Sequence, residues 1–242
     1  RDVTNIEIEL PEDDSAGEVQ ILDICADTNG RIWLSTSLGG LHFYNENSDR
    51  FIGFPDIRYD DFNLTEATIT QIRPANDGGL LLGVTGKGPL KFYPETRTVK
   101  QLSFSGGLAY RREWGDVVLL EAHDGTIWLG TWGAGLFTYS KGSSGFTRYR
   151  SDGFPEEIKF IKSIYEDNDG NIWIIPLDDG VFRIDLLTNS VIQLHHENGD
   201  SHTISSNKVE AVFQDFSGTL WIGSDAGVDK FSKFKYKFNS TR

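Results

Sequence analysis

Trp114 and Trp132 are the tryptophans of this sequence best placed for ligand chemistry, because both lie in polar loops that contain glycine. Trp132 stands within residues 131–135, Thr-Trp-Gly-Ala-Gly, where small neighbours offer little to bury an indole. Trp114 follows the basic pair Arg111 and Arg112. An exposed indole can pack on the C–H face of a pyranose while nearby charged groups hydrogen-bond the sugar hydroxyls. The pattern predicts a sugar-binding surface; the alternative is that both indoles fill gaps between neighbouring repeats.

Two further candidates, Tyr59 and Asp178, lie in other loops. The six candidate ligand-binding residues all carry an aromatic or charged side chain in a loop: Tyr59, Arg111, Arg112, Trp114, Trp132 and Asp178. No catalytic residue is predicted, because no Gly-x-Ser-x-Gly elbow is present for a nucleophilic serine. A glycoside hydrolase or lyase remains an alternative. It would need two convergent carboxylates, and pairings among Asp178, Asp179 and Asp225 are the only ones available.

Neither a metal site nor a cofactor is predicted. The single cysteine, Cys25, cannot form an internal disulfide or a multi-thiolate site, and we expect a buried small hydrophobe there rather than a reactive thiol. His195 and His196 are adjacent, so on a strand their side chains would point to opposite sides. Residues 167–171 have the composition of a calcium loop, but Gly170 comes too early for its ligand spacing, and a tight turn is expected instead.

The charge balance excludes several partners. There are 23 Lys and Arg against 36 Asp and Glu, a formal net charge of −13. A field of that sign repels phosphate backbones and anionic lipid, so we predict no nucleic-acid binding. No apolar run approaches the ~18 residues of a membrane span, so no direct membrane contact is predicted. The sequence has no methionine, and we expect it to be a piece of a longer polypeptide.

A repeat positions these candidates. Its anchor glycines recur at spacings of 48, 47, 45 and 48 residues, and they are Gly30, Gly78, Gly125, Gly170 and Gly218. Three residues after each anchor stands a large apolar side chain, in order Trp33, Leu81, Trp128, Trp173 and Trp221. Nine and six residues before the anchor, four repeats carry an Ile or Val pair, as at Ile21 and Ile24, whereas the third has Asp116 at the first position. Self-similarity at such a period indicates a propeller, a solenoid or an array.

Each repeat is predicted to contain four short strands. In the fourth repeat these are residues 161–166, 171–175, 181–185 and 191–194, β-branched or aromatic segments bounded by turn residues and lacking a helical period. The sequence therefore predicts an all-β propeller of five four-stranded blades in a single domain, residues 1–242. The expected blades span approximately residues 18–55, 66–103, 115–150, 158–195 and 206–240.

Residues 3–10 are predicted to form an extra outer strand, because Ile6, Ile8 and Leu10 alternate with polar residues. The segment resembles the fourth strand of a blade whose other strands are missing, which makes the five blades part of a larger ring. Alternatively, it completes the last blade and closes a small ring. The fifth repeat has its own candidate fourth strand at residues 236–238, and we favour the larger ring.

One sequence motif occurs three times, in residues 124–140, 161–185 and 209–231. It consists of a turn that ends in glycine, an apolar-Trp-apolar strand, and then a glycine, an aliphatic residue and an aromatic residue. This motif resembles the two-component-regulator propeller repeat, which is found in periplasmic sensors of Bacteroidetes hybrid two-component systems. The resemblance implies a seven-bladed ring and a periplasmic location. It also implies an oligosaccharide ligand and, as partners in the ectodomain, a second propeller and an immunoglobulin-like domain.

The links between blades indicate which face binds. In a four-stranded blade, the loop after the second strand and the link to the next blade open on the same face. The links are long, at residues 55–68, 103–115, 151–160 and 195–208, and long loops in compact domains are often functional. We therefore expect a non-catalytic, extracytoplasmic module that senses an oligosaccharide on this face. A scaffold for protein contacts is a further alternative, and a homodimer is left open.

Overall fold

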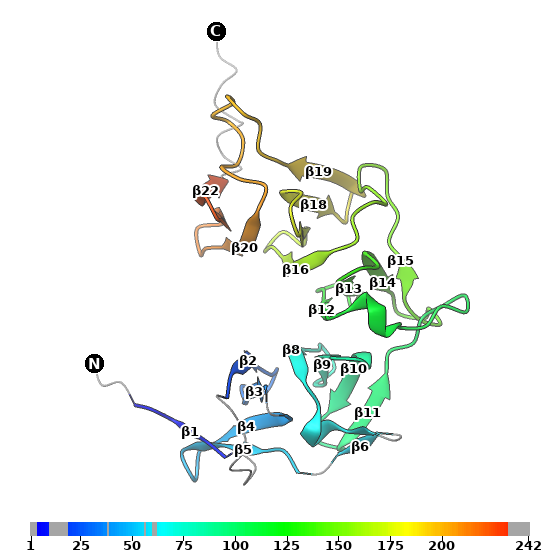
Figure 1. Cartoon of the computed structure of the whole chain (residues 1–242), viewed down its shortest axis with the longest axis vertical. Helices are drawn as coiled ribbons and strands as arrows, with labels where there is room; N and C mark the ends of the chain where they lie inside the picture. The colour runs from blue at the N-terminus through cyan, green and yellow to red at the C-terminus, as the bar shows by residue number, and fades with distance from the viewer. Residues whose placement is uncertain (1–3, 10–18, 38, 56, 60–61, 232–242) are drawn as a thin grey trace. The chain divides into compact units, whose positions relative to one another are not determined.

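The chain forms a β-propeller of five small sheets that follow one another along the sequence (Figure 1). This computed structural model describes residues 4–9, 19–37, 39–55, 57–59 and 62–231. Two compact units divide the chain: the first holds residues 1–129 and 138–147, and the second holds residues 130–137 and 148–242. No helix of the described residues is long and apolar enough to cross a membrane. The all-β propeller predicted from the sequence is confirmed.

The first sheet has five strands in the order β1-β5-β4-β3-β2. They are β1 (Glu7–Ile8), β2 (Ile21–Ala26), β3 (Ile32–Thr36), β4 (Leu41–Asn45) and β5 (Arg50–Gly53). Strand β1 pairs in parallel with β5, with Glu7 opposite Arg50 and Ile8 opposite Phe51. This arrangement differs from both interpretations of the N-terminal segment, because β1 joins the first blade instead of another blade. An outer edge strand offers unpaired backbone groups that a further segment can use in either direction.

The next three sheets each contain four strands. The second sheet, in the order β11-β10-β9-β8, contains β8 (Ile69–Pro74), β9 (Leu80–Val84), β10 (Gly88–Tyr93) and β11 (Thr98–Gln101). The third, in the order β12-β13-β14-β15, contains β12 (Val117–Glu121), β13 (Ile127–Thr131), β14 (Leu136–Tyr139) and β15 (Thr147–Arg148). The fourth, in the order β16-β17-β18-β19, contains β16 (Ile161–Glu166), β17 (Ile172–Pro176), β18 (Val181–Asp185) and β19 (Ser190–Leu194).

The fifth sheet shows three strands, β20 (Val209–Gln214), β21 (Leu220–Ser224) and β22 (Gly227–Phe231). The fourth strand expected at residues 236–238 lies outside the described residues. Two short elements occupy the link between the first two blades: the hairpin β6 (Arg58–Tyr59) and β7 (Phe62–Asn63), and the 3₁₀ turn η1 (Leu64–Glu66). A second 3₁₀ turn, η2 (Arg112–Trp114), precedes β12.

The conformation of the turn between the first two strands of a blade explains why glycine recurs at the anchor position. Gly30 has a φ of +82° and Gly170 one of +78°, a conformation that costs glycine little and other residues more. An aspartate three residues earlier closes the turn, since the Asp27 carboxylate accepts hydrogen bonds from the backbone N–H of Asn29 and Arg31. The motif is thus a structural turn in each blade that carries it.

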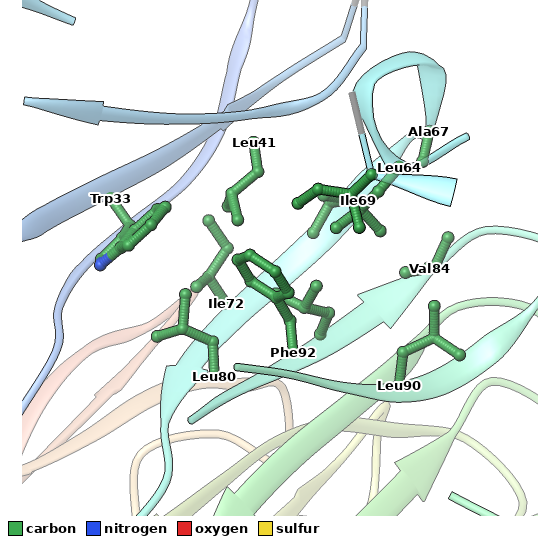
Figure 2. Packing of buried hydrophobic residues seen from close by; sticks show 12 residues of the cluster. Trp33, Leu41, Leu64, Ala67, Ile69, Ile72, Leu80, Val84, Leu90 and Phe92 are labelled. Carbon is green, nitrogen blue, oxygen red and sulfur yellow. The ribbon is translucent and has the colours of Figure 1, made fainter. Parts of the chain in front are cut away.

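Adjacent blades are joined by an apolar layer. In the first unit, Trp33 and Leu41 of the first blade share a buried cluster with Ile69, Ile72 and Leu80 of the second blade, and Figure 2 shows these side chains. Because each blade buries its faces against its neighbours, the recurring Trp and Ile positions of the sequence are explained by packing.

The second unit repeats this layer. Trp173 and Val181 of the fourth blade pack with Val209, Val212 and Leu220 of the fifth. The residues that meet occupy the same repeat positions as those between the first two blades.

Irregular first strands add polar links between blades. A β-bulge or register shift interrupts the pairing of β2, β8, β16 and β20 with the following strand. After the bulge in β2, Asp23 Oδ2 accepts a hydrogen bond of 2.8 Å from the backbone N–H of Ile72 in the next blade. After the bulge in β8, the Gln71 side chain accepts one in the same way from the Leu119 N–H. A β-bulge changes the direction of a side chain. Here the bulges direct the side chains of Asp23 and Gln71 towards the neighbouring blade.

Candidate functional site

On the face where the links between blades open, backbone hydrogen bonds fasten links onto the preceding blade. The N–H of Gly40 donates to the carbonyl of Ala67 at 3.0 Å, and the N–H of Gly180 donates to the carbonyl of Asn207 at 2.9 Å. A Cβ on Gly180 would lie 2.2 Å from the carbonyl oxygen of Leu194, closer than any side chain tolerates. The glycine before β4, and that before β18, is therefore required for close approach as well as for its positive φ.

Trp132 lies on this face of the second unit and remains 42% exposed. Its backbone forms an isolated antiparallel bridge with Phe160, and the two ring centroids are 5.5 Å apart at an interplanar angle of 69°. Phe160 is also exposed, to 43%. The N–H of Gly133 donates to the Lys159 carbonyl at 2.9 Å, which holds the turn against the link. The two rings thus form an exposed aromatic platform, named here the Trp132–Phe160 platform.

Sequence reasoning missed Phe160. It immediately precedes β16, and a phenylalanine next to an apolar strand is usually a core residue. The available signal was its place in the long link 151–160, directly before the repeat's first Ile position.

Asp178 follows Leu177, whose backbone contacts this platform. The N–H of Leu177 donates to the carbonyl of Phe160 at 3.1 Å, so Asp178 follows a residue held to the platform. Its side chain and that of Asp179 are exposed, and the Asp179 carbonyl accepts a hydrogen bond of 2.9 Å from Gln193 Nε2. The structure therefore brings two of the six candidates, Trp132 and Asp178, to one group of loops.

Trp114 has a different environment in the first unit. It ends η2 half-buried, with its ring 5.3 Å from that of Phe104 and 6.2 Å from that of Tyr110. The Tyr110 hydroxyl donates to the Gly115 carbonyl at 2.7 Å, and burial raises the pKa of this phenol. A Cβ on Gly88 would lie 2.5 Å from the Tyr110 ring. These contacts favour the structural alternative for Trp114, as an anchor of the link before the third blade.

Of the other three candidates, only Arg112 is in contact with the β9–β10 turn. Arg112 lies over this turn, where a Cβ on Gly86 would be 3.4 Å from its Nε atom. Arg111 is exposed at the start of η2. Tyr59 is half-buried in the hairpin opposite Phe62, and Lys87 Nζ of the turn lies 5.2 Å from the Phe62 ring centroid. Tyr59, Arg111, Arg112 and Trp114 belong to the first unit, whereas the Trp132–Phe160 platform belongs to the second.

The first blade contains a pocket of about 270 Å³ that sequence reasoning did not find. Its lining includes Glu9, His42, Phe54 and Thr65. His42 is buried, and its Nε2 atom lies 3.1 Å from the carbonyl oxygen of Glu9, so Nε2 carries the proton. Burial lowers the pKa of His42, although the Glu9 and Gly40 carbonyls oppose this effect. The imidazole is therefore neutral at pH 7.

The histidines of the link 195–208 make local contacts. His195 Nε2 lies 3.0 Å from the carboxylate of Glu197, and His196 Nδ1 lies 2.8 Å from the carbonyl of Ile204. Within the described part of the chain, no three His, Cys, Asp or Glu side chains form a group that could hold a metal ion. Cys25 is half-buried on β2, where burial and the nearby Asp23 carboxylate raise its thiol pKa to about 12. The thiol is therefore protonated and weakly nucleophilic at neutral pH.

Two segments of the chain, residues 15–37 and 157–175, match the family model described as two component regulator propeller. Histidine kinase P4 of Formosa agariphila is 25% identical over 197 residues, which make up 79% of this chain and 14% of that protein. The chain therefore spans about one seventh of the length of this curated relative.

Solved structures share the fold. The extracellular domain of a putative hybrid two-component system from B. thetaiotaomicron has a TM-score of 0.65 at 22% identity, covering 92% of this chain and 28% of that one. Virginiamycin B lyase from Staphylococcus aureus has a TM-score of 0.61 at 12% identity, covering 89% of this chain and 74% of that one. At these identities the likeness concerns the fold alone. The two matched segments, residues 15–37 and 157–175, are similar to the two-component-regulator propeller repeat that the sequence resembles.

Proposed function

We propose that this chain is a non-catalytic, ligand-binding module of an extracytoplasmic sensor, and that its ligand is an oligosaccharide. The sensor role is supported by the two matched repeat segments and by the similarity to the ectodomain of a putative hybrid two-component system. A repeat specifies the fold and not the ligand, so the ligand class must come from the surface that the loops build.

The Trp132–Phe160 platform carries the oligosaccharide proposal. Two aromatic rings that are each more than two fifths exposed leave costly apolar surface in water. The C–H face of a pyranose covers such rings, and the exposed carboxylate of Asp178 can accept hydrogen bonds from sugar hydroxyls. A charged or purely apolar ligand would use only one part of this surface.

Isothermal titration calorimetry of the chain tests this proposal. The probes are neutral and acidic oligosaccharides from plant and algal polysaccharides, titrated one at a time. We expect saturable binding of at least one probe, weakened about tenfold or more by Trp132→Ala, since losing a stacked ring costs on the order of 1.4 kcal/mol or more. Leu187→Ala is the matched control, because Leu187 is 94% exposed on the β18–β19 turn. Absence of binding to every probe, or equal binding by Trp132→Ala, would contradict the proposal.

Location and partners follow from the same proposal. A sensor of this kind lies in the periplasm as part of an ectodomain, with a second propeller and an immunoglobulin-like domain as its covalent neighbours. Binding must favour one arrangement of that receptor over another, or no signal results.

The second candidate function is a lyase or glycoside hydrolase. It is favoured by the shared fold with virginiamycin B lyase, of which this chain covers 74%. Asp178 is then the candidate acid or base. A turnover assay with the same oligosaccharides separates the two functions: the sensor binds and leaves the probe intact, whereas the enzyme consumes it and loses activity in Asp178→Asn.

A further inference from the structure

The Trp132–Phe160 platform is built from three segments of the second unit. They are the β13–β14 turn, the end of the link before β16 and the β17–β18 turn, at residues 131–135, 156–160 and 177–180. Backbone hydrogen bonds join these segments. The N–H of Gly135 donates to the Lys159 carbonyl at 2.9 Å, and the N–H of Leu177 donates to the Phe160 carbonyl at 3.1 Å. The charged side chains of the three segments therefore belong to the same group of loops as the two exposed rings.

Most of the charge in this group of loops is negative. Its charged side chains are all exposed, and they are four carboxylates and one ammonium group: Glu156, Glu157, Asp178, Asp179 and Lys159. Four negative charges against one positive charge give the three segments a formal charge of −3. The sign agrees with that of the whole chain, whose formal net charge is −13.

The cations of this region are already engaged. Lys159 Nζ donates to the carbonyl oxygen of Glu156 at 3.0 Å. Arg150, which precedes the segment in the same link, lies with its Nε atom 3.6 Å from the Glu156 carboxylate and offsets that one charge. The other three carboxylates form no ion pair within the described part of the chain, and they are those of Glu157, Asp178 and Asp179. A ligand on the platform therefore meets an excess of negative charge.

Resting on the oligosaccharide function proposed above, we propose that the Trp132–Phe160 platform selects uncharged oligosaccharides and rejects those that carry a carboxylate or a sulfate group. The C–H face of a pyranose covers the rings in both cases, so the rings themselves do not discriminate. The surrounding carboxylates do, because they accept hydrogen bonds from sugar hydroxyls but repel an anionic substituent. Repulsion of the wrong ligand is a usual source of specificity.

Calorimetry with matched probes tests this selectivity. Oligogalacturonate and oligomannuronate are each compared with their carboxyl-reduced form, which has the same linkages and carries a hydroxymethyl group in place of each carboxylate. At 10 mM salt the screening length is about 30 Å, and we expect the reduced form to bind about tenfold or more tightly than the acidic form. At 1 M salt the screening length is about 3 Å, so this ratio of affinities should fall towards one.

A charge-reversal variant tests the carboxylates directly. Asp179→Lys replaces an exposed side chain and should lower the ratio of neutral to acidic affinity about threefold or more. Glu46→Lys is the matched control, because it changes the net charge equally but lies on the β4–β5 turn of the first unit. It should leave the ratio as in the native chain. Circular dichroism of both variants checks that they fold, and the salt series on the native chain needs no variant.

The outcomes separate this inference from the oligosaccharide proposal itself. Binding confined to uncharged probes, with the expected response to salt and to Asp179→Lys, supports the selectivity. An acidic probe that binds as tightly as its reduced form at 10 mM salt would overturn it and leave the oligosaccharide proposal standing. The same holds for a ratio that Glu46→Lys lowers as much as Asp179→Lys does. Absence of binding to every probe, neutral or acidic, would overturn both.

Discussion

Asp167 binds the indole of Trp173: its Oδ2 atom accepts a hydrogen bond of 2.9 Å from Nε1 of the tryptophan. The same bond joins Asp27 to Trp33 at 2.9 Å and Asp215 to Trp221 at 2.8 Å. One carboxylate thus closes the turn between two strands and satisfies the indole on the second of them. In these three blades the turn and the core therefore depend on the same side chain.

Replacing Asp167 with alanine should strongly destabilise the chain. Asp167 is buried, and its removal leaves the Trp173 indole N–H and the Asn171 backbone N–H without their acceptor. Losing hydrogen bonds to a buried carboxylate costs about 3 kcal/mol. Urea unfolding measures the change, with Asp152→Ala in an exposed link as the control. Equal midpoints for the two variants would contradict this role.

Acid should weaken the fifth blade through Asp215. Hydrogen bonds from Ser217 and Trp221 lower the pKa of this carboxyl to about 2 from its ordinary value of 3.8. A lowered pKa in the folded chain means that the stabilisation is present above about pH 4 and is lost as the pH falls towards about 2. Thermal unfolding between pH 5 and pH 2 should therefore show a steeper fall for the native chain than for Asp215→Asn. Parallel curves would show that Asp215 contributes nothing in this range.

His42 should cause a separate loss of stability at mildly acidic pH. Burial lowers its pKa below the ordinary 6.5, so the unfolded chain binds more protons than the folded chain as the pH falls through that range. In the register of β3 and β4, His42 is opposite Leu34. At the matching position of the fourth blade, Phe182 is opposite Ile174, and phenylalanine is therefore the replacement chosen for His42. His42→Phe should make the melting temperature less dependent on pH below about 6.5, as measured by thermal scans. An unchanged slope would show that another group titrates.

Two glycine substitutions separate backbone strain from steric contact. Gly180 and Gly199 have φ values of +68° and +89°. A Cβ on Gly180 would collide with the Leu194 carbonyl, while one on Gly199 would meet nothing within 4 Å. Gly199→Ala should cost about 1 kcal/mol from the unfavourable φ alone. Gly180→Ala should cost more by loosening the link 195–208. Comparable unfolding free energies for the two variants would argue against fastening of the link by Gly180.

The blade architecture could be predicted from the sequence because local signals and core positions coincide. The repeat positions of Gly170 and Trp173 both recur along the sequence. The glycine is explained by the positive φ of the turn, and the tryptophan by packing between blades. The pairing of β1 could not be predicted, since an outer strand edge selects its partner through backbone groups that carry no sequence signal.

The loop residues were harder to assign for a related reason. The exposure of Trp114 depends on its contacts with Phe104 and Tyr110. Both residues lie in the same link, but no periodicity of the sequence predicts how they pack. Phe160 escaped notice because its exposure is set by the turn that holds Trp132, far from it in sequence.

The most direct test of the sensor proposal is ¹⁹F NMR of the chain labelled with 5-fluorotryptophan, titrated with the oligosaccharide probes. Trp132→Phe assigns the resonance of Trp132. The proposal predicts that this resonance shifts saturably with at least one probe while those of the buried Trp33 and Trp173 stay in place. A Trp132 resonance that is unmoved by a probe that binds the chain would contradict it.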